Sequence, residues 1–177
     1  MGALNPKMLQ LTGSLSDGVI LTRATLDHVR SANALITEAA ERAGRDPAAI
    51  DRAVLIPCAL NQDAGAAREI LRPGFALYAA RFPRYRELME RAGFSAEVSA
   101  ARAAWDDEGP AAAAAKLPDD LIDAMALAGP ADRIRAGLAR YREAGVTLPI
   151  LALASSQPSG VLEAQRLIDA VSPLTGD

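Results

Sequence analysis

The stretch GALNPK at residues 2–7 has the residue types of an anion site at the start of a helix. Asn5 can cap a helix, and Pro6 suits the first helical position. A glycine lets an anion approach the backbone, where the free amides of a helix start carry partial positive charge. Because Pro6 has no amide, the donors must come from Leu4, Asn5 and Lys7. The pattern predicts either a phosphate site or a capped helix without a ligand.

A second candidate for anion binding is Arg23, which follows the short apolar run DGVIL at residues 17–21. This run is typical of a buried strand, and Thr22 and Arg23 are expected to project at its carboxyl end. An arginine there can hold an anionic group through two parallel hydrogen bonds. The alternative is a solvated loop arginine.

Other reactive residue types favour structural roles. His28 is the only histidine, so it has no histidine partner for a metal site. Cys58 lies in an apolar run, where a thiol usually packs without reacting. The acidic run at residues 106–108 suits a solvated helix end better than a metal site. Spacings typical of a Ser nucleophile elbow, a P-loop or a Cys/His metal site are not found.

The elements that position these residues alternate between helix and strand. Helices are predicted at about 6–15, 26–43, 131–144 and 161–171, with Thr25 capping the second, and strands at 17–21, 53–60 and 148–153. Residues 63–128 have helical patterns only, so they predict a helical insertion. The segment 155–160 is expected to be a loop.

The run AVLIPCAL at residues 53–60 is too apolar for a strand with one solvated face, so both faces are expected to be covered, as in parallel sheets. Pro57 inside it removes a backbone donor and requires an edge or a bulge. Parallel strands joined by right-handed helical crossovers fit the order of elements. Three such strands do not close a barrel, so the predicted single α/β domain, residues 1–177, has open sheet edges.

Composition argues against several classes of protein. The formal net charge is -3, and the chain lacks a basic run, which argues against a nucleic-acid partner. The single cysteine excludes an intramolecular disulfide framework and fits a reducing compartment. Since the sequence has neither an apolar run of membrane-spanning length nor a signal-peptide pattern, it predicts a cytoplasmic protein without a membrane partner.

Several segments together resemble the bacterial luciferase-like flavin monooxygenase family. They are GALNPKMLQLTGSLSDGVIL, the GRDP that ends a helical spacer, the D-x-x-x-A of residues 63–67, and LAGPADRIRAGLARYREAGVTLPIL. The nearest branch is the deazaflavin-dependent one, which includes methylenetetrahydromethanopterin reductase. The resemblance runs from Gly2 to about Leu174. It implies the carboxyl-terminal portion of a TIM (β/α)8 barrel that carries a helical insertion.

The resemblance also implies a site. In the family, the loop equivalent to Gly2, Ala3, Leu4 and Asn5 contacts the phosphate of the cofactor. The strand equivalent to the one that bears Gly18 lies beside that cofactor. Arg23 is then a candidate for binding the substrate. The cofactor implied is the deazaflavin coenzyme F-420, with FMN as the alternative. Catalytic residues of the family lie mainly outside the matched part, so none is assigned.

Two functions remain open from the sequence. The chain can be the carboxyl-terminal part of a luciferase-like oxidoreductase that supplies the cofactor phosphate-binding loop. It can also be a non-catalytic truncated barrel or an interaction subunit. In that second case the open sheet edges favour a homodimer or a complementary barrel half as partner.

Overall fold

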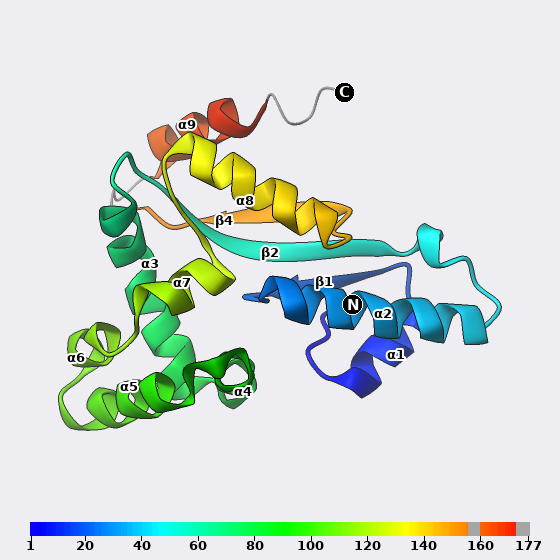
Figure 1. Cartoon of the computed structure of the whole chain (residues 1–177), viewed down its shortest axis with the longest axis horizontal. Coiled ribbons are helices and arrows are strands. Elements are labelled where there is room, and N and C mark those ends of the chain that lie inside the picture. The colour runs from blue at the N-terminus through cyan, green and yellow to red at the C-terminus, as the bar shows by residue number, and fades with distance from the viewer. Residues whose placement is uncertain (156–159, 173–177) are drawn as a thin grey trace. The chain divides into compact units, whose positions relative to one another are not determined.

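The computed structural model describes residues 1–155 and 160–172, and these form two compact units (Figure 1). The first unit comprises Met1–Ile56 and Leu138–Leu151, and the second comprises Pro57–Gly137 together with the chain from Ala152 onward. Each unit is described separately below. The loop predicted at 155–160 lies largely outside the described residues.

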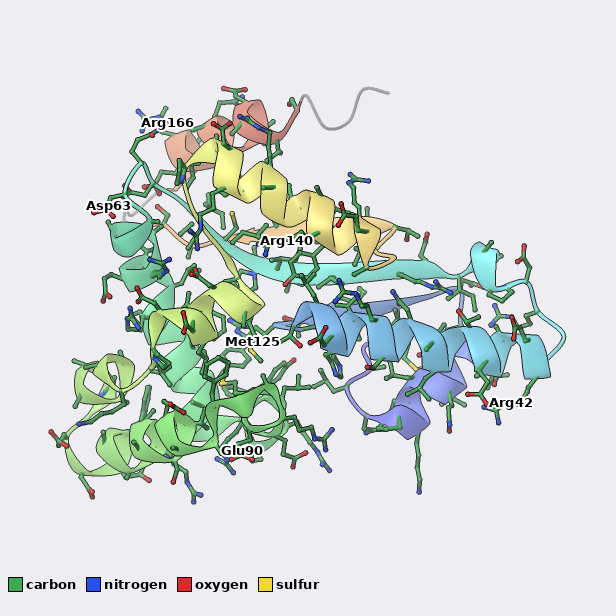
Figure 2. The ribbon with its side chains drawn as sticks, viewed as in Figure 1. Arg42, Asp63, Glu90, Met125, Arg140 and Arg166 are labelled. Atoms are coloured by element: carbon green, nitrogen blue, oxygen red, sulfur yellow. The ribbon has the colours of Figure 1, made fainter. Side chains whose placement is uncertain are left out.

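The first unit opens with α1 (Pro6–Leu15), β1 (Gly18–Thr22) and α2 (Leu26–Arg42). Both predicted caps are confirmed: the side chain of Asn5 accepts from the Met8 amide, and that of Thr25 accepts from the His28 amide. A short 3-10 helix, η1 (Pro47–Ala49), precedes β2 (Asp51–Leu60). Arg42 at the end of α2 is labelled in Figure 2.

The sheet of the first unit is parallel, as predicted. β1 pairs with β2 from Gly18 opposite Asp51 to Thr22 opposite Leu55. β4 (Leu148–Leu153) also pairs with β2. Alternate residues of β1 differ sharply in exposure, because Val19 and Leu21 are each 1% exposed whereas Ile20 is 47% exposed. One face of β1 is therefore covered, and the other is open.

The second unit is mostly helical. Its first helix, α3, is capped by Asp63, which is labelled in Figure 2; the Asp63 carboxylate accepts from the Gly65 amide at 2.8 Å. The elements after β2 are α3 (Ala64–Arg81), α4 (Pro83–Met89), the π-helical η2 (Glu90–Phe94), α5 (Ser95–Asp107), α6 (Pro110–Ala115), α7 (Asp119–Met125), β3 (Leu127–Gly129), α8 (Ala131–Glu143), which continues into the first unit, and α9 (Val161–Val171).

The strand β3 was not predicted from the sequence, and the stretch 63–128 was wrongly taken as wholly helical. Three residues are too few for a periodic signal, although β3 pairs in parallel with Cys58–Leu60 of β2. This pairing also explains Pro57. The β1 register ends at Leu55 and the β3 register begins at Cys58, so the proline lies in the interval between the two registers.

The helices α1 and α2 pack closely at Gly13. A Cβ at this position would lie 2.4 Å from the Ile36 carbonyl oxygen and 2.8 Å from the Ala39 Cβ. The guanidinium of Arg45 also donates to the Gly13 carbonyl at 2.8 Å. Glycine is required here by the close approach of the two helices, which fixes where the start of α1 lies.

We expect Gly13→Ala to lower the free energy of unfolding by about 1–3 kcal/mol, because the added methyl group must displace backbone of α2. Gly74→Ala in α3 is the matched control: nothing lies within 4 Å of its Cβ position. This control should raise the free energy of unfolding by about 0.5–1 kcal/mol through helix propensity. Urea unfolding measures the change in the free energy of unfolding for both variants. Changes of the same sign in the two variants would contradict the packing argument.

Candidate functional site

The start of the chain lies beside β1 at one isolated parallel bridge. The Ile20 amide donates to the Met1 carbonyl at 2.8 Å, and Gly2 forms a parallel bridge with Ile20. The odd-numbered residues of β1 form their backbone hydrogen bonds with β2, and the Arg23 amide continues this pattern by donating to the Leu55 carbonyl. Even-numbered Ile20 bonds to Met1 instead, so the start of the chain lies on the other edge of β1. The start of the chain thus extends the sheet.

This pairing brings most of the predicted site residues together. The chain runs parallel to β1 at the Gly2–Ile20 bridge, so beyond Gly2 it continues in the direction in which Thr22 follows Ile20. The start of α1 therefore lies next to the carboxyl end of β1. Ala3, which is 3% exposed, shares the covered face of the sheet, whereas Gly2 and Leu4 belong to the same open face as Ile20.

Several backbone amides at the start of α1 have no hydrogen-bond acceptor among the described residues. Asn5 has φ -113° and ψ 158°, an extended conformation that any residue adopts, so glycine is not needed there. Its side chain accepts from the Met8 amide at 3.0 Å, and its carbonyl accepts from the Leu9 amide at 3.1 Å. Within the described residues, the amides of Leu4, Asn5 and Lys7 have no hydrogen-bond acceptor.

Gly2, close to these donors in the sequence, is surrounded by open space. A Cβ built on Gly2 meets nothing within 4 Å, and Gly2 does not have a positive φ, so neither packing nor conformation of this chain explains the glycine. At the neighbouring strand end, the hydroxyl of Thr22 is buried and has no hydrogen-bond partner among the described residues. Open space, unspent amides and an unpaired hydroxyl are what an anion would use.

Arg23 occupies an unusual backbone conformation at the end of β1. Its φ is 50°, and within the described part of the chain no other residue except glycine has a positive φ. Such a conformation costs about 1–3 kcal/mol for a residue with a side chain, and it tends to occur at functional sites. The sharp change of direction ends β1 and holds this partly buried arginine at the carboxyl end of the strand, as predicted.

Gly18 does not join the other predicted residues. It lies at the amino end of β1, opposite Asp51, whereas the start of α1 lies near the carboxyl end. A Cβ on Gly18 would lie 2.9 Å from the Cβ and 3.0 Å from the carbonyl oxygen of Asp51. Packing between neighbouring strands therefore explains this glycine, and its contact with a cofactor stays a prediction.

The remaining reactive residues have structural surroundings. The His28 amide donates to the Thr25 hydroxyl at 3.2 Å in the first turn of α2. Burial raises the pKa of the Cys58 thiol to about 12, which keeps it protonated and unreactive. Among residues 1–155 and 160–172 the structure has no group of three His, Cys, Asp or Glu side chains that could hold a metal ion. No described helix is long and apolar enough to cross a membrane.

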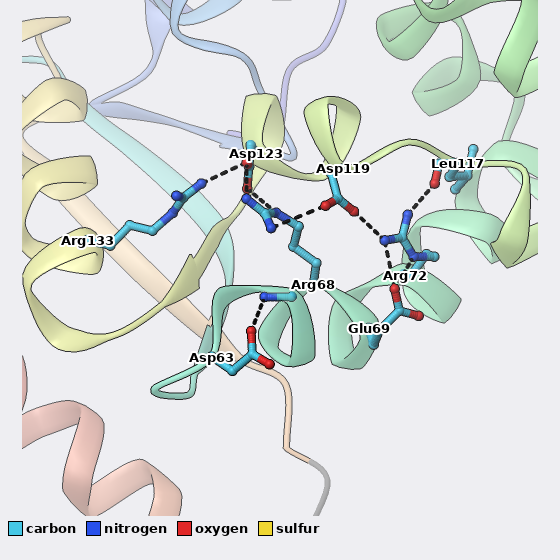
Figure 3. A network of polar contacts seen from close by, with 9 residues as sticks. Asp63, Arg68, Glu69, Arg72, Leu117, Asp119, Asp123 and Arg133 are labelled. Carbon is cyan, nitrogen blue, oxygen red and sulfur yellow. Dashed lines mark hydrogen bonds and ion pairs between the residues drawn. The ribbon is translucent and has the colours of Figure 1, made fainter.

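The densest polar cluster lies in the second unit, between α3 and α7 (Figure 3). Arg68 donates to both carboxylate oxygens of Asp123 at 3.0 and 2.7 Å and lies 3.2 Å from Asp119. Arg133 donates to Asp123 at 2.7 Å. The buried Arg72 donates to Glu69, to Asp119 and to the Leu117 carbonyl.

Sequence reasoning missed this cluster, because its partners lie up to 55 residues apart and no local pattern joins them. Each of these guanidinium groups is already engaged by protein oxygens, so the cluster ties α7 to α3 rather than offering a binding site. Burial alone would raise the pKa of Asp123, but the hydrogen bond from Arg68 and the charge of Arg133 hold it below its ordinary value.

Comparison with known proteins gives a consistent result. The family described as luciferase-like monooxygenase matches residues 1–148. The 5,10-methylenetetrahydromethanopterin reductases of Methanolobus tindarius and Archaeoglobus fulgidus are each 30% identical to this chain, over 151 and 152 residues. Each match covers 83% of this chain but only 45% of the relative, so the chain spans less than half the length of these curated relatives.

Solved structures agree on the fold. The coenzyme F-420 dependent tetrahydromethanopterin reductase from Methanopyrus kandleri has a TM-score of 0.81 at 24% identity, covering 97% of this chain and 48% of that one. An F-420-dependent secondary alcohol dehydrogenase has a TM-score of 0.66 at 19% identity, covering 96% of this chain and 47% of that one. The predicted fold class, part of a TIM (β/α)8 barrel with parallel strands and a helical insertion, is confirmed.

The ion pairs of Asp123 predict an acid-sensitive second unit. Because the pKa of Asp123 is lower in the folded chain, its stabilisation is complete above the unfolded value near 4 and is lost as the pH falls through the folded value. We expect Asp123→Asn to lower the free energy of unfolding by about 1–2 kcal/mol at pH 7 and by much less near pH 2.

The matched control is Asp27→Asn, which removes an ion pair with Arg30 on the surface of α2. Since both side chains there are mostly exposed, its effect should stay within about 0.5 kcal/mol at either pH. Urea unfolding at both pH values measures the two variants. An Asp123→Asn effect that does not change with pH would refute the electrostatic explanation.

Proposed function

The chain belongs to the luciferase-like monooxygenase family, and from this premise we propose that it contributes the cofactor phosphate-binding loop of a flavin- or deazaflavin-dependent oxidoreductase. The observation that carries this proposal is the start of α1, where amides without acceptors lie beside the carboxyl end of β1 and the Cβ position of Gly2 opens into space. Gly2, Ala3, Leu4 and Asn5 form the proposed loop.

The electrostatics of α1 support a phosphate at this place. Its ten residues give the helix start a partial positive charge, which falls on the unspent amides of Asn5 and Lys7. The exposed side chain of Lys7 adds a full positive charge in the first turn. The Asn5 side chain is occupied by its capping bond, so its part is to hold the amides in place rather than to touch the anion.

Arg23 is proposed as the residue for an anionic substrate or cofactor tail. Its strained backbone places it at the carboxyl end of β1, where (β/α)8 barrels bind their ligands. When bound, the cofactor supplies the hydride or oxygen chemistry, and the residues of this chain bind and orient it. No described residue of this chain is assigned a catalytic role.

The deazaflavin coenzyme F-420 is the proposed cofactor, with FMN as the alternative. The curated relatives at 30% identity are named as methylenetetrahydromethanopterin reductases, and the structure with TM-score 0.81 is titled as F-420 dependent. A more distant structural neighbour, the oxygenating constituent of 3,6-diketocamphane monooxygenase from Pseudomonas putida, is titled as a complex with FMN, at TM-score 0.58. Both cofactors carry the phosphate that the loop would bind.

We expect Asn5→Asp to change stability and binding in opposite directions. Aspartate keeps the cap and places a negative charge at the helix start, which should raise the free energy of unfolding by about 0.3–1 kcal/mol. The same charge repels a phosphate, so the affinity for F-420 and for FMN should fall about tenfold or more. Calorimetric titration and urea unfolding of the purified chain measure the two effects.

Gln10→Glu is the matched control, since it adds the same charge by the same amide-to-acid change one turn further along α1. It should leave the affinity for FMN within about twofold. Riboflavin, which has the same ring without the phosphate, should bind Asn5→Asp and the unchanged chain equally. If the unchanged chain does not distinguish FMN from riboflavin, the phosphate site is not there.

A second candidate, an interaction subunit completed by a partner polypeptide, is favoured by exposed apolar side chains on two strands of the first unit. Ile20 on β1 is 47% exposed and Leu148 on β4 is 51% exposed, although both belong to strands of a parallel sheet. Parallel sheets ordinarily have both faces covered. A second copy of this chain or a complementary barrel half would cover these side chains.

If two copies of the chain form a homodimer, sedimentation analysis of the purified chain should give a mass of about 37 kDa, twice its 18.5 kDa. Ile20→Lys should then shift it to the monomer mass, because a buried lysine in the interface is costly. Leu15→Lys, at an exposed leucine of α1, should leave the mass unchanged. A monomeric unchanged chain would contradict the homodimer and leave the complementary barrel half.

A further inference from the structure

We propose that Thr22 is a further binding residue of this site, whose hydroxyl turns on ligand binding to donate a hydrogen bond to the phosphate held at the start of α1. This inference rests on the function proposed above and adds a side-chain donor that no local sequence pattern indicates. It is carried by three observations: the place of Thr22 in the sheet, the state of its hydroxyl, and the contrast with the other threonines.

Thr22 lies where the strand end and the helix start meet. It is the last residue of β1, opposite Leu55, and by period two it shares the open face of the strand with Ile20. On the other edge of β1, the isolated Gly2–Ile20 bridge lies two residues before Thr22, and the chain continues from Gly2 towards α1 in the same direction as β1. The unspent amides of the helix start follow directly after Leu4.

The hydroxyl of Thr22 is unsatisfied in the empty site. Its Oγ1 atom is buried and finds no hydrogen-bond partner among the described residues. A buried hydroxyl without a partner is destabilising, since it has lost its bonds to water and gained none. Valine has nearly the same shape and is at least as good a strand residue, so stability of the empty chain does not explain a threonine here.

The four other threonines within the described residues all have hydrogen-bond partners. The Thr12 hydroxyl donates to the Met8 carbonyl at 2.9 Å, and the Thr25 hydroxyl accepts from the His28 amide. The hydroxyls of Thr37 and Thr147 accept from the side chain and the amide of Arg52 at 2.7 and 2.8 Å. Thr22 therefore differs from the other described threonines, because its hydroxyl has no hydrogen-bond partner.

A ligand can reach this hydroxyl through a small motion. Thr22 as a whole is only partly buried, although its Oγ1 is enclosed. Rotation about χ1 between staggered positions exchanges the hydroxyl and the methyl group without moving the backbone. The turned hydroxyl then donates to a phosphate oxygen, which is a charge-assisted hydrogen bond, and the methyl group takes the enclosed position.

The test compares Thr22→Val, which removes the hydroxyl and keeps the shape, with Thr22→Ser, which keeps the hydroxyl. Titration of the purified chain with FMN, riboflavin and inorganic phosphate gives the affinities, and thermal unfolding of the empty chain gives the stability. Thr22→Val should weaken FMN and inorganic phosphate about tenfold, leave riboflavin unchanged, and raise the unfolding temperature. Thr22→Ser should restore the affinity for FMN to within about threefold of the unchanged chain.

Thr37→Val is the matched control, because its hydroxyl already accepts from Arg52. This variant should lower the unfolding temperature and leave the affinity for FMN unchanged. The inference about Thr22 is overturned if Thr22→Val binds FMN as well as the unchanged chain, weakens riboflavin equally, or lowers the unfolding temperature.

These outcomes separate the inference from the function on which it rests. If the unchanged chain binds FMN and riboflavin alike, the phosphate site fails and the role of Thr22 fails with it. If the unchanged chain prefers FMN and Asn5→Asp removes that preference while Thr22→Val does not, the phosphate site stands and only Thr22 is excluded.

Discussion

The parallel bridge between Gly2 and Ile20 of β1 is the constraint on which the candidate site depends. Parallel neighbours end at the same edge of a sheet, so the helix that follows the first segment must start where β1 ends. Gly13 then fixes the direction of α1, because the absence of a side chain lets the backbone of α1 pack directly against α2. A sheet register and one helix contact together bring the amides after Leu4 to the same place as Thr22 and Arg23.

Much of this arrangement could be predicted because its signals are local. Asn5 before Pro6 and Thr25 before Leu26 each mark a helix start within four residues, and both caps are present in the structure. The apolar run of β2 predicts a buried parallel strand without any knowledge of its partners, and the run at 148–153 predicts the strand β4. The family resemblance selected the helix start that is proposed as the phosphate site, which the cap alone could not do, since capped helices are common.

The rest could not be predicted because it depends on distant pairing. The place of Gly18 opposite Asp51 follows from a register that no short segment reveals, and its expected contact with the cofactor stays a prediction. β3 is a strand only because Cys58–Leu60 offers it a partner. The left-handed conformation of Arg23 and the unpaired hydroxyl of Thr22 are properties of the folded backbone and its surroundings, and their residue types do not indicate them.

The two polar clusters of this chain differ in whether their hydrogen-bonding groups are used. In the second unit, Arg68 and Arg72 are satisfied by carboxylates and a carbonyl, and such a saturated cluster has nothing left for a ligand. At the start of α1, the amides of Asn5 and Lys7 and the hydroxyl of Thr22 have no partner, and the glycine beside them leaves space. Asn5 and Lys7 are exposed, so water can bind their amides as it does at other helix starts, whereas the enclosed hydroxyl of Thr22 is destabilising while it has no partner. The start of α1 therefore offers hydrogen-bonding groups that the saturated cluster lacks, and this difference is the basis of the proposed phosphate site.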